Sequence, residues 1–205
     1  MVILGITGGL ATGKTTVAGL FRQFGAKVLD ADDIAHDLLQ PGRPAFKAVV
    51  RHFGGHILHA GRIDRQQLSQ RVFRDAQERR VLEGLLHPRV LKYIRRELAL
   101  IGMRADVPAA VLDVPLLFEA GWQAWVDVTV VVKTNRRVQL ARLKRKRHMS
   151  AQDARYRIQA QMPLRRKIAM ADFVIDNNGS LNETRKQVLH IWRTIIIRDR
   201  HIGSS

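Results

Sequence analysis

The sequence predicts an α/β protein in which a parallel sheet is flanked by helices, with a helical insertion and a helical lid. An apolar, β-branched run at residues 2–6 leads through a glycine-rich loop into an amphipathic helix, and a second apolar run follows at 26–29. The order strand, glycine loop, helix, strand is typical of a parallel sheet. Strand-like runs resume only at 109–114 and 126–132. The 33–105 segment shows helical periodicity alone and is expected to be an insertion.

The first helix is expected over residues 15–24, because its apolar residues fall on one helical face. Gly25 follows it at the position where a helix commonly ends in a left-handed residue. Inside the insertion, Asp64 and Asp75 are expected to cap two helices, one over 65–73 and a longer one after Asp75.

The last third of the chain is expected to return to the sheet. Asn135 can cap a very basic helix at 136–147, and a second basic helix is expected to end near Met162. A short strand is expected at 173–175 and a closing helix at 180–197. These elements divide the chain into a sheet-forming α/β core (1–32, 106–135 and 168–205), a helical domain expected to hold a substrate (33–105) and a basic helical lid (136–167).

The composition is that of a globular protein with one main core. The chain has 205 residues, of which 46% are hydrophobic and 26% charged. No apolar run approaches the roughly 20 residues of a membrane span, and no positive region precedes the first apolar run as in a signal peptide. The absence of cysteine excludes disulfides and Cys-type zinc sites, which fits a cytoplasmic protein.

The net charge is the unusual feature of the composition. Thirty-five Lys and Arg against 18 Asp and Glu give a net charge of +17. Residues 133–167 contain thirteen of these basic residues and a single acid, Asp153, and so carry +12. This clustering favours a site for a polyanion, while the scattered remainder is equally compatible with an arginine-rich composition that serves no partner.

Residues 8–15 match the pattern G-x-x-x-x-G-K-[ST] and stand between a predicted strand and a predicted helix, as a phosphate-binding P-loop requires. Glycines let the backbone approach a phosphate, and the helix N-terminus presents partial positive charge to it. Lys14 adds a full charge, and the Thr15 hydroxyl can ligate Mg²⁺. The residues expected to bind ATP here are Gly9, Leu10, Ala11, Thr12, Gly13, Lys14, Thr15 and Thr16.

Other P-loop classes lack their signatures in this sequence. A GTPase should carry D-x-x-G after a strand and an N/T-K-x-D tetrad, but Asp113 is followed by Val114-Pro115-Leu116 and the tetrad is absent. The LSGGQ-type signature of transporter ATPases is also absent, and an oligomeric motor ATPase would normally be longer. A small P-loop kinase remains.

Three carboxylates are candidates for chemistry. Asp30 and Asp32 follow a predicted strand beside the P-loop, where side chains reach the ligand crevice of a parallel sheet. Asp32 could orient or deprotonate an acceptor hydroxyl, hold Mg²⁺ through water, or only cap the next helix. Asp113 ends an apolar strand and is a candidate Mg²⁺ contact together with Thr15.

The basic helices hold the candidate lid residues. An arginine can offer a bidentate fork to the oxygens of a phosphoryl group in the transition state, and Arg142 and Arg147 are candidates for this role. Arg157 and Gln161, four positions apart, can line the same crevice.

Several short stretches in a fixed order give the chain a specific resemblance. They are Gly5-Ile6-Thr7-Gly8-Gly9 with Gly13-Lys14-Thr15-Thr16, Asp30-Ala31-Asp32, Gln40-Pro41-Gly42, Leu86-His87-Pro88, Pro115-Leu116-Leu117-Phe118-Glu119, Arg157-Ile158 with Ala160-Gln161, and Val174-Ile175-Asp176-Asn177. In this order they resemble the dephospho-CoA kinases. One departure is Ala11, where that family usually has glycine.

The resemblance implies ATP-dependent phosphorylation of the ribose 3′-hydroxyl of dephospho-CoA with Mg²⁺, the last step of coenzyme A synthesis. It implies that Lys14, Asp32 and Arg147 are catalytic, with Asp32 as the base, and that the loop at Asn177 meets the adenine of ATP. Substrate-binding residues by the same resemblance are Thr7, Asp32, His87, Leu116, Arg157 and Gln161. We expect a monomer with at most weak self-association, and neither a membrane nor a specific nucleic acid as partner.

Two other functions stay open at this point. One is a different small-molecule P-loop kinase, acting on a nucleoside, a nucleotide or a sugar acid. The other is an RNA-binding P-loop NTPase, which the charge of +17 favours and the clustering of charge in a lid disfavours.

Overall fold

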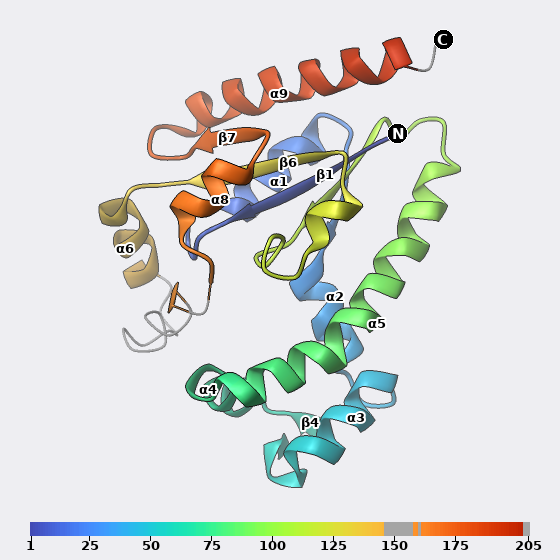
Figure 1. Cartoon of the computed structure of the whole chain (residues 1–205), viewed down its shortest axis with the longest axis vertical. Coiled ribbons are helices and arrows are strands. Elements are labelled where there is room, and N and C mark those ends of the chain that lie inside the picture. Colours follow the sequence, from blue (N-terminus) through green and yellow to red (C-terminus); the bar gives the residue numbers. More distant parts are fainter. Residues whose placement is uncertain (146–157, 160, 203–205) are drawn as a thin grey trace.

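The computed structural model describes residues 1–145, 158–159 and 161–202. Five parallel strands form one sheet in the order β2-β5-β1-β6-β7, which confirms the predicted fold class (Figure 1). The strands are β1 (Val2–Gly8), β2 (Lys27–Asp30), β5 (Ala109–Asp113), β6 (Val128–Lys133) and β7 (Phe173–Asp176). Because β1 is central, the loop after it emerges in the middle of the carboxyl edge of the sheet.

Helices cover both faces of this sheet (Figure 1). On one face α1 and α9 pack together, and Phe21 and Ile191 are buried there with Leu4 of β1. On the other face α2, α5 and η2 bury Val90 and Leu112. The helices are α1 (Lys14–Gln23), α2 (Ala31–Leu38), α5 (Ala76–Gly102), η2 (Trp122–Trp125), α6 (Arg136–Arg145), α8 (Leu164–Met170) and α9 (Leu181–Ile202).

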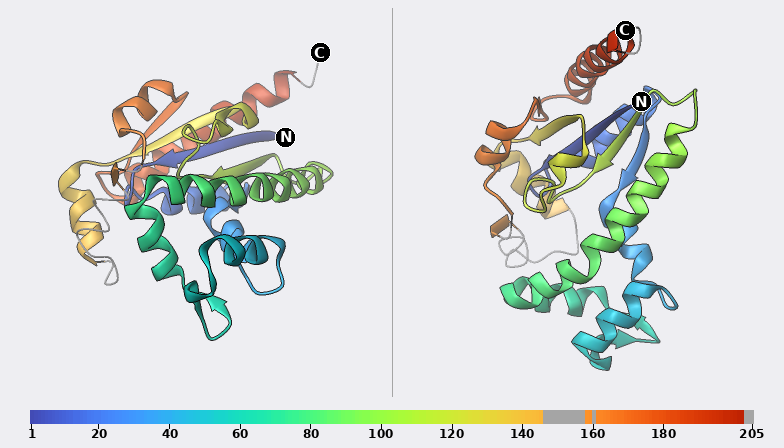
Figure 2. Two further views of the ribbon diagram at one scale, coloured as in Figure 1. Left: turned by 60° about the horizontal axis from the view of Figure 1, so that its bottom comes forward. Right: turned by 45° about the vertical axis from the view of Figure 1, so that its right-hand side comes forward.

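The insertion between β2 and β5 has a small core of its own. It extends away from the sheet in all three views (Figures 1 and 2). Val49, Phe53, Ile57 and Leu68 are buried in it, and α5 connects it back to the sheet. Its elements before α5 are α2, α3 (Pro44–Phe53), η1 (Gly55–Ile57), β3 (Leu58–His59), β4 (Arg62–Ile63) and α4 (Arg65–Arg74).

The expectation that 33–105 contains no strand is wrong. β3 and β4 form an antiparallel hairpin, in which Leu58 pairs with Ile63. The two residues of its turn, Ala60 and Gly61, have φ angles of 49° and 74°, as the tight turns of hairpins require. Strands of two residues are too short to show the alternating pattern that identifies a strand in a sequence.

Most of the predicted helix starts are confirmed. The carboxylates of Asp64 and Asp75 accept from backbone N–H groups at the starts of α4 and α5, and Asn135 Oδ1 accepts from Val138 N at 2.9 Å. At α2 the cap is Asp30, whose Oδ1 accepts from the N–H groups of Asp32 and Asp33 at 2.8 and 3.2 Å. The interpretation of Asp32 as the cap is therefore wrong. Most of the second basic helix predicted before Met162 lies outside the described residues.

The long helix α5 changes direction near its middle (Figure 1), where Pro88 stands inside it. Proline has no N–H to donate to the carbonyl of Gly84, and its ring crowds that carbonyl, so the helix bends there. The bend lets the first half of α5 pack against α4 while the second half runs along the sheet. None of the described helices combines the length and apolarity needed to cross a membrane.

Candidate active site

The loop between β1 and α1 has the backbone of a phosphate cradle. Gly13, which precedes the first residue of α1, is left-handed with φ 92°. A Cβ at Gly13 would overlap Nδ2 of Asn177, so glycine is required there for space as well as for conformation. Ala11 is also left-handed, with φ 59°. No side chain caps α1, which leaves its N-terminal N–H groups directed at a ligand.

Lys14 forms an ion pair with Asp113, which ends β5 beside β1. Asp113 is 1% exposed, and its Oδ2 has no hydrogen-bond partner among the residues that the structure describes. Burial raises the pKa of Asp113 to about 6, Lys14 opposes the rise, and the charges of Asp30 and Asp32 add to it. Three carboxylates and one ammonium group therefore influence one another at the carboxyl edge of the sheet.

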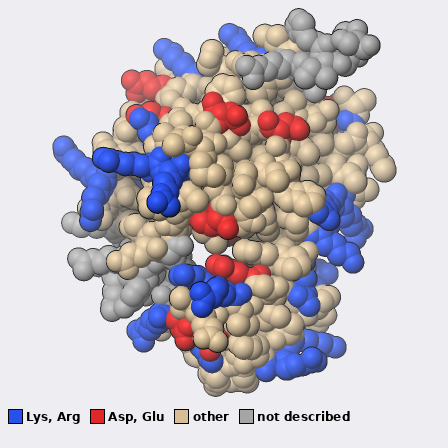
Figure 3. Space-filling view, viewed as in Figure 1, with Lys and Arg blue, Asp and Glu red and all other residues tan. Residues whose placement is uncertain are grey.

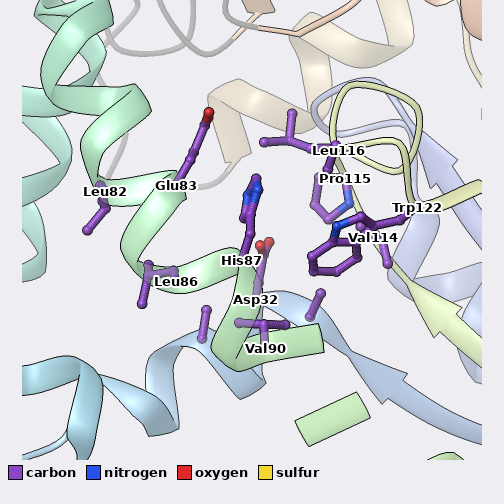
Figure 4. Close-up of a pocket in the computed structure, with 13 residues that line it drawn as sticks. Asp32, Leu82, Glu83, Leu86, His87, Val90, Val114, Pro115, Leu116 and Trp122 are labelled. Carbon is purple, nitrogen blue, oxygen red and sulfur yellow. The ribbon is translucent and has the colours of Figure 1, made fainter. Parts of the chain in front are cut away.

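A cavity of about 150 Å³ lies between α2, α5 and the segment after β5. Asp32 and His87 both line it, and Figure 4 shows their side chains at its centre. Leu116 lies on the opposite wall, so three residues that the sequence predicted as substrate-binding meet in one pocket (Figure 4). Its lining residues are Ala31, Asp32, Ala35, Leu82, Glu83, Leu86, His87, Val90, Val114, Pro115, Leu116, Ala120 and Trp122.

His87 is held on the wall of this pocket by Trp122. The two rings meet edge to face, with centroids 5.4 Å apart. Burial lowers the pKa of His87, and the charge of Glu83 opposes this shift. A neutral imidazole next to an indole offers a substrate ring both a flat apolar contact and a hydrogen-bonding nitrogen.

Helix α6 is bonded directly to the P-loop. Gln139 Nε2 donates to the carbonyl of Leu10 at 2.5 Å. Arg142 donates from its two terminal nitrogens to the carbonyls of Thr12 and Asn177, both at 3.0 Å. Gln139 is not among the residues predicted from the sequence, because a glutamine in a basic helix carries no signal by itself. The basic segment is therefore in contact with the phosphate cradle through α6.

Asn177 is buried, and both polar atoms of its side-chain amide make hydrogen bonds within the protein. Its Nδ2 donates to the carbonyl of Thr12 at 2.8 Å, and its Oδ1 accepts from Thr184 Oγ1 at 2.9 Å. These bonds show that Asn177 braces the P-loop. The adenine contact expected for this residue stays a prediction.

Thr7 is also buried, and its hydroxyl donates to the carbonyl of Pro115 at 2.9 Å. It lies behind the pocket wall and does not line the cavity. The same carbonyl accepts from Lys167 Nζ at 2.7 Å, and this lysine also pairs with Glu119. From the sequence, Lys167 was identified only as one of the basic residues of the predicted lid.

The remaining predicted residues are less involved in the described contacts. Thr15 and Thr16 are exposed at the start of α1, as side chains that meet a solvent-borne ligand must be. Gln161 is half-buried beside the return of the chain from the lid. Arg147 and Arg157 lie outside the described residues.

The donor set suits a metal ion that arrives with a nucleotide better than a resident one. Within the described ranges, no three His, Cys, Asp or Glu side chains gather in a way that could hold an ion. The unpartnered Oδ2 of Asp113 and the exposed hydroxyl of Thr15 are two oxygen donors at the mouth of the P-loop. Mg²⁺ in kinases commonly takes one or two protein oxygens and fills its other positions with water and phosphate oxygens.

The charge on the visible face is distributed and not gathered in one patch. Figure 3 shows Lys and Arg along both sides of this face, with acidic side chains on both sides of a hollow between the sheet and the insertion. The acids that the pocket contributes are Asp32 and Glu83. A polyanion would be attracted by the basic surroundings and would meet the carboxylates of Asp32 and Glu83 at the pocket.

Residues 2–183 match the family model described as dephospho-CoA kinase. A dephospho-CoA kinase of Syntrophotalea carbinolica is 43% identical over 197 residues, 96% of this chain and 93% of that protein. One of Symbiobacterium thermophilum is 46% identical, over 94% of this chain and 81% of that protein. A crystal structure of a Thermus thermophilus protein, 33% identical, has a TM-score of 0.80 and covers 94% of this chain and 96% of that one. The chain belongs to the dephospho-CoA kinase family.

Proposed function

We propose that this chain transfers the γ-phosphoryl group of ATP to the ribose 3′-hydroxyl of dephospho-CoA, giving coenzyme A and ADP. The observation that carries the proposal is the placement of Asp32, which lines the apolar pocket and also acts electrostatically on Asp113 beside the P-loop. Membership of the family makes the enzyme a phosphotransferase with an alcohol acceptor.

The phosphates of ATP bind at the P-loop in this proposal. The free N–H groups at the start of α1 and the ammonium group of Lys14 meet their charge. Lys14 is held by Asp113 before the nucleotide arrives, so its ammonium group is already fixed at the cradle. Such preorganised charge stabilises the phosphoryl group during transfer without reorganisation at that moment.

The acceptor ribose lies in the pocket, with its hydroxyl directed at Asp32. Asp32 lies in the first turn of α2, directly after β2, which β5 separates from β1 and its P-loop. Its carboxylate can accept the hydroxyl proton as the oxygen attacks phosphorus. The apolar lining from α5 and the wall at Leu116 bury the adenosine part of the acceptor. His87 and Trp122 supply the flat wall against which a base can pack.

We assign Mg²⁺ to the mouth of the P-loop, with Thr15 and Asp113 as the residues that would hold it, directly or through water. When bound with ATP it neutralises charge that develops on the phosphate oxygens. Among the described residues Oδ2 of Asp113 has no hydrogen-bond partner while Oδ1 pairs with Lys14, so one carboxylate oxygen would be available to the ion.

The basic segment predicted at 136–167 supplies the lid as far as Met162, because α8 (Leu164–Met170) packs against β6 and belongs to the core. Helix α6 anchors the lid on the P-loop. Arg142 is close enough to the loop carbonyls to exchange them for phosphate oxygens. Arg147 is the lid arginine that acts in the transition state. The other boundaries of the core and the substrate domain stay as given above, and the enzyme works as a cytoplasmic monomer on ATP and dephospho-CoA, without a membrane or a specific nucleic acid.

The test couples ADP formation to a spectrophotometric readout, with and without dephospho-CoA. ADP formation that depends on dephospho-CoA is expected; ADP formation with shikimate or gluconate and none with dephospho-CoA would contradict the proposal.

Asp32→Asn sharpens this test. It should leave ATP binding intact and lower kcat by roughly 10²–10⁴-fold, the usual contribution of a positioned base. The matched control is Asp30→Asn, two positions away, because asparagine also caps helices and should leave kcat within a few-fold of wild type. Equal losses in the two variants would remove Asp32 from the role of base.

A further inference from the structure

Lys167 is the one lysine or arginine whose side chain is fully buried in the part of the chain that the structure describes. It stands in α8, where the chain has returned from the lid to pack against β6. Its ammonium group donates to the carbonyl of Pro115 at 2.7 Å and lies 3.5 Å from the hydroxyl of Thr7. It also forms an ion pair with Glu119 Oε1 at 2.9 Å.

These contacts join three segments that are distant in sequence. Thr7 lies in the last two residues of β1, and Pro115 and Glu119 belong to the segment after β5. Glu119 Oε1 also accepts from the backbone N–H of Met162 at 2.7 Å, where the chain comes back from the lid. A single buried ammonium group therefore ties the loop after β5 to β1 and to the end of the lid.

Stability alone is a weak explanation of this arrangement. Burial lowers the pKa of Lys167, against the effect of Glu119, so the ammonium form is held at a cost. Replacing a buried ion pair by apolar groups of similar volume is often neutral or stabilising. What apolar groups could not do is fix the direction of the Pro115 carbonyl, which here accepts from both Thr7 and Lys167.

That carbonyl belongs to the wall of the acceptor pocket. Pro115 and Leu116 both line the cavity, on the side opposite to α5 (Figure 4). The side chain of Lys167 itself is 0% exposed and does not line the cavity, so it cannot touch a substrate there. Its influence on the reaction has to pass through the backbone that it holds.

We propose that Lys167 is a positioning residue for the acceptor: with Glu119 it fixes the pocket wall at Pro115 and Leu116 and couples that wall to the end of the lid. This inference rests on the proposed function of the pocket. The P-loop is held mainly by α6 and Asn177, through other bonds. Loss of Lys167 should therefore loosen the acceptor side much more than the ATP side.

The test compares Lys167→Met, which keeps most of the volume and removes the charge, with wild type. The expected result is a rise of about tenfold or more in KM for dephospho-CoA at saturating ATP, with KM for ATP changed less than about twofold; the first figure corresponds to the loss of one charge-assisted hydrogen bond. Arg104→Met is the matched control, because Arg104 pairs with Asp106 at a surface position that is 52% exposed. It should change neither KM.

A structural role alone would lower the melting temperature and leave the two KM values of the remaining folded enzyme unchanged or equally changed, which would overturn the proposal. Should Lys167→Met fail to fold, Glu119→Gln provides the same comparison, because it removes the charge of the pair and keeps an acceptor for Met162. The wild-type assay distinguishes failure of the proposed function from failure of the role of Lys167. If the wild-type enzyme shows no turnover with dephospho-CoA, the proposed function is refuted. If the wild-type enzyme turns over and the variant has unchanged KM values, only the role of Lys167 is refuted.

Discussion

Asp113 is a buried acid whose charged form is disfavoured by the fold. Its pKa is about 6 in the folded protein and ordinarily 3.8. Since the folded state binds this proton more readily than the unfolded state does, the stabilising contribution is present below pH 4 and is lost as the pH rises through 6. At neutral pH the ionised carboxylate therefore destabilises the protein without nucleotide, by at most roughly 3 kcal/mol.

We predict that Asp113→Asn unfolds at higher urea concentration than wild type at pH 7.5, and that the difference in free energy of unfolding shrinks toward pH 4.5. Urea titrations at pH 4.5, 6 and 7.5 measure this. A difference that is independent of pH would show that the pKa of Asp113 is ordinary. The variant should also lose turnover, since the oxygen assigned to Mg²⁺ is replaced.

Ala11 holds a left-handed conformation that costs a residue with a Cβ about 1–2 kcal/mol. We predict that Ala11→Gly stabilises the protein by about 0.5–1 kcal/mol, the relief of strain being partly offset by the greater freedom of glycine in the unfolded chain. Urea unfolding without ligand checks it. Gly61→Ala in the β3–β4 turn is the control. Because Gly61 has a φ of 74°, this substitution should lower the free energy of unfolding, the opposite of the effect expected for Ala11→Gly.

Physical reasoning along the chain could predict the part of the site that is made by neighbours in sequence, whereas His87 and Leu116 of the pocket were predicted only from the resemblance to the family. Lys14 and Gly13 follow from the spacing within a single loop. Lys167 and Gln139 do not, because their partners Pro115 and Leu10 lie 52 and 129 positions away. Only the packing of α6 and α8 onto the sheet brings those atoms together.

Among helices and turns, too, the features set by neighbouring residues were predicted and the others were not. The caps at Asp64 and Asp75 are local and were predicted, since a side chain two or three residues before an N–H group decides them. At Asp30 and Asp32 the sequence offered two acids for one cap, and only the exact end of β2 shows that Asp30 takes it. The β3–β4 hairpin was missed because each strand is two residues long.

The bend of α5 at Pro88 places the pocket residues of this helix. Leu82, Glu83 and His87 come before the proline and Val90 comes after it, yet all line one cavity. We predict that Pro88→Ala restores the hydrogen bond to Gly84, straightens α5 and raises KM for dephospho-CoA several-fold, while KM for ATP stays within twofold. Steady-state kinetics with each substrate varied in turn measures this, and an unchanged KM for dephospho-CoA would show that the bend does not shape the pocket.

The net charge of +17 acts over the entire surface. Both substrates are polyanions, and a positive surface raises their encounter rate until salt screens it. We predict that raising sodium chloride from about 50 to about 500 mM increases KM for ATP and for dephospho-CoA several-fold and changes kcat much less. A neutral solute at matched viscosity is the control. A fall in kcat at unchanged KM would indicate that salt acts on the bonds of the site instead.

The strand order also decides when the enzyme can be assembled during its own synthesis. β1, at residues 2–8, leaves the ribosome first, but its two neighbours in the sheet are β5 and β6, at 109–113 and 128–133. At about 5–20 residues per second, an apolar strand and its attached phosphate loop wait for several seconds without either of the strands that flank them in the sheet. Translation speed and chaperones that hold extended apolar segments should therefore decide how much of this chain reaches the active fold, and slowing synthesis across the insertion should lengthen the period in which β1 is exposed to aggregation.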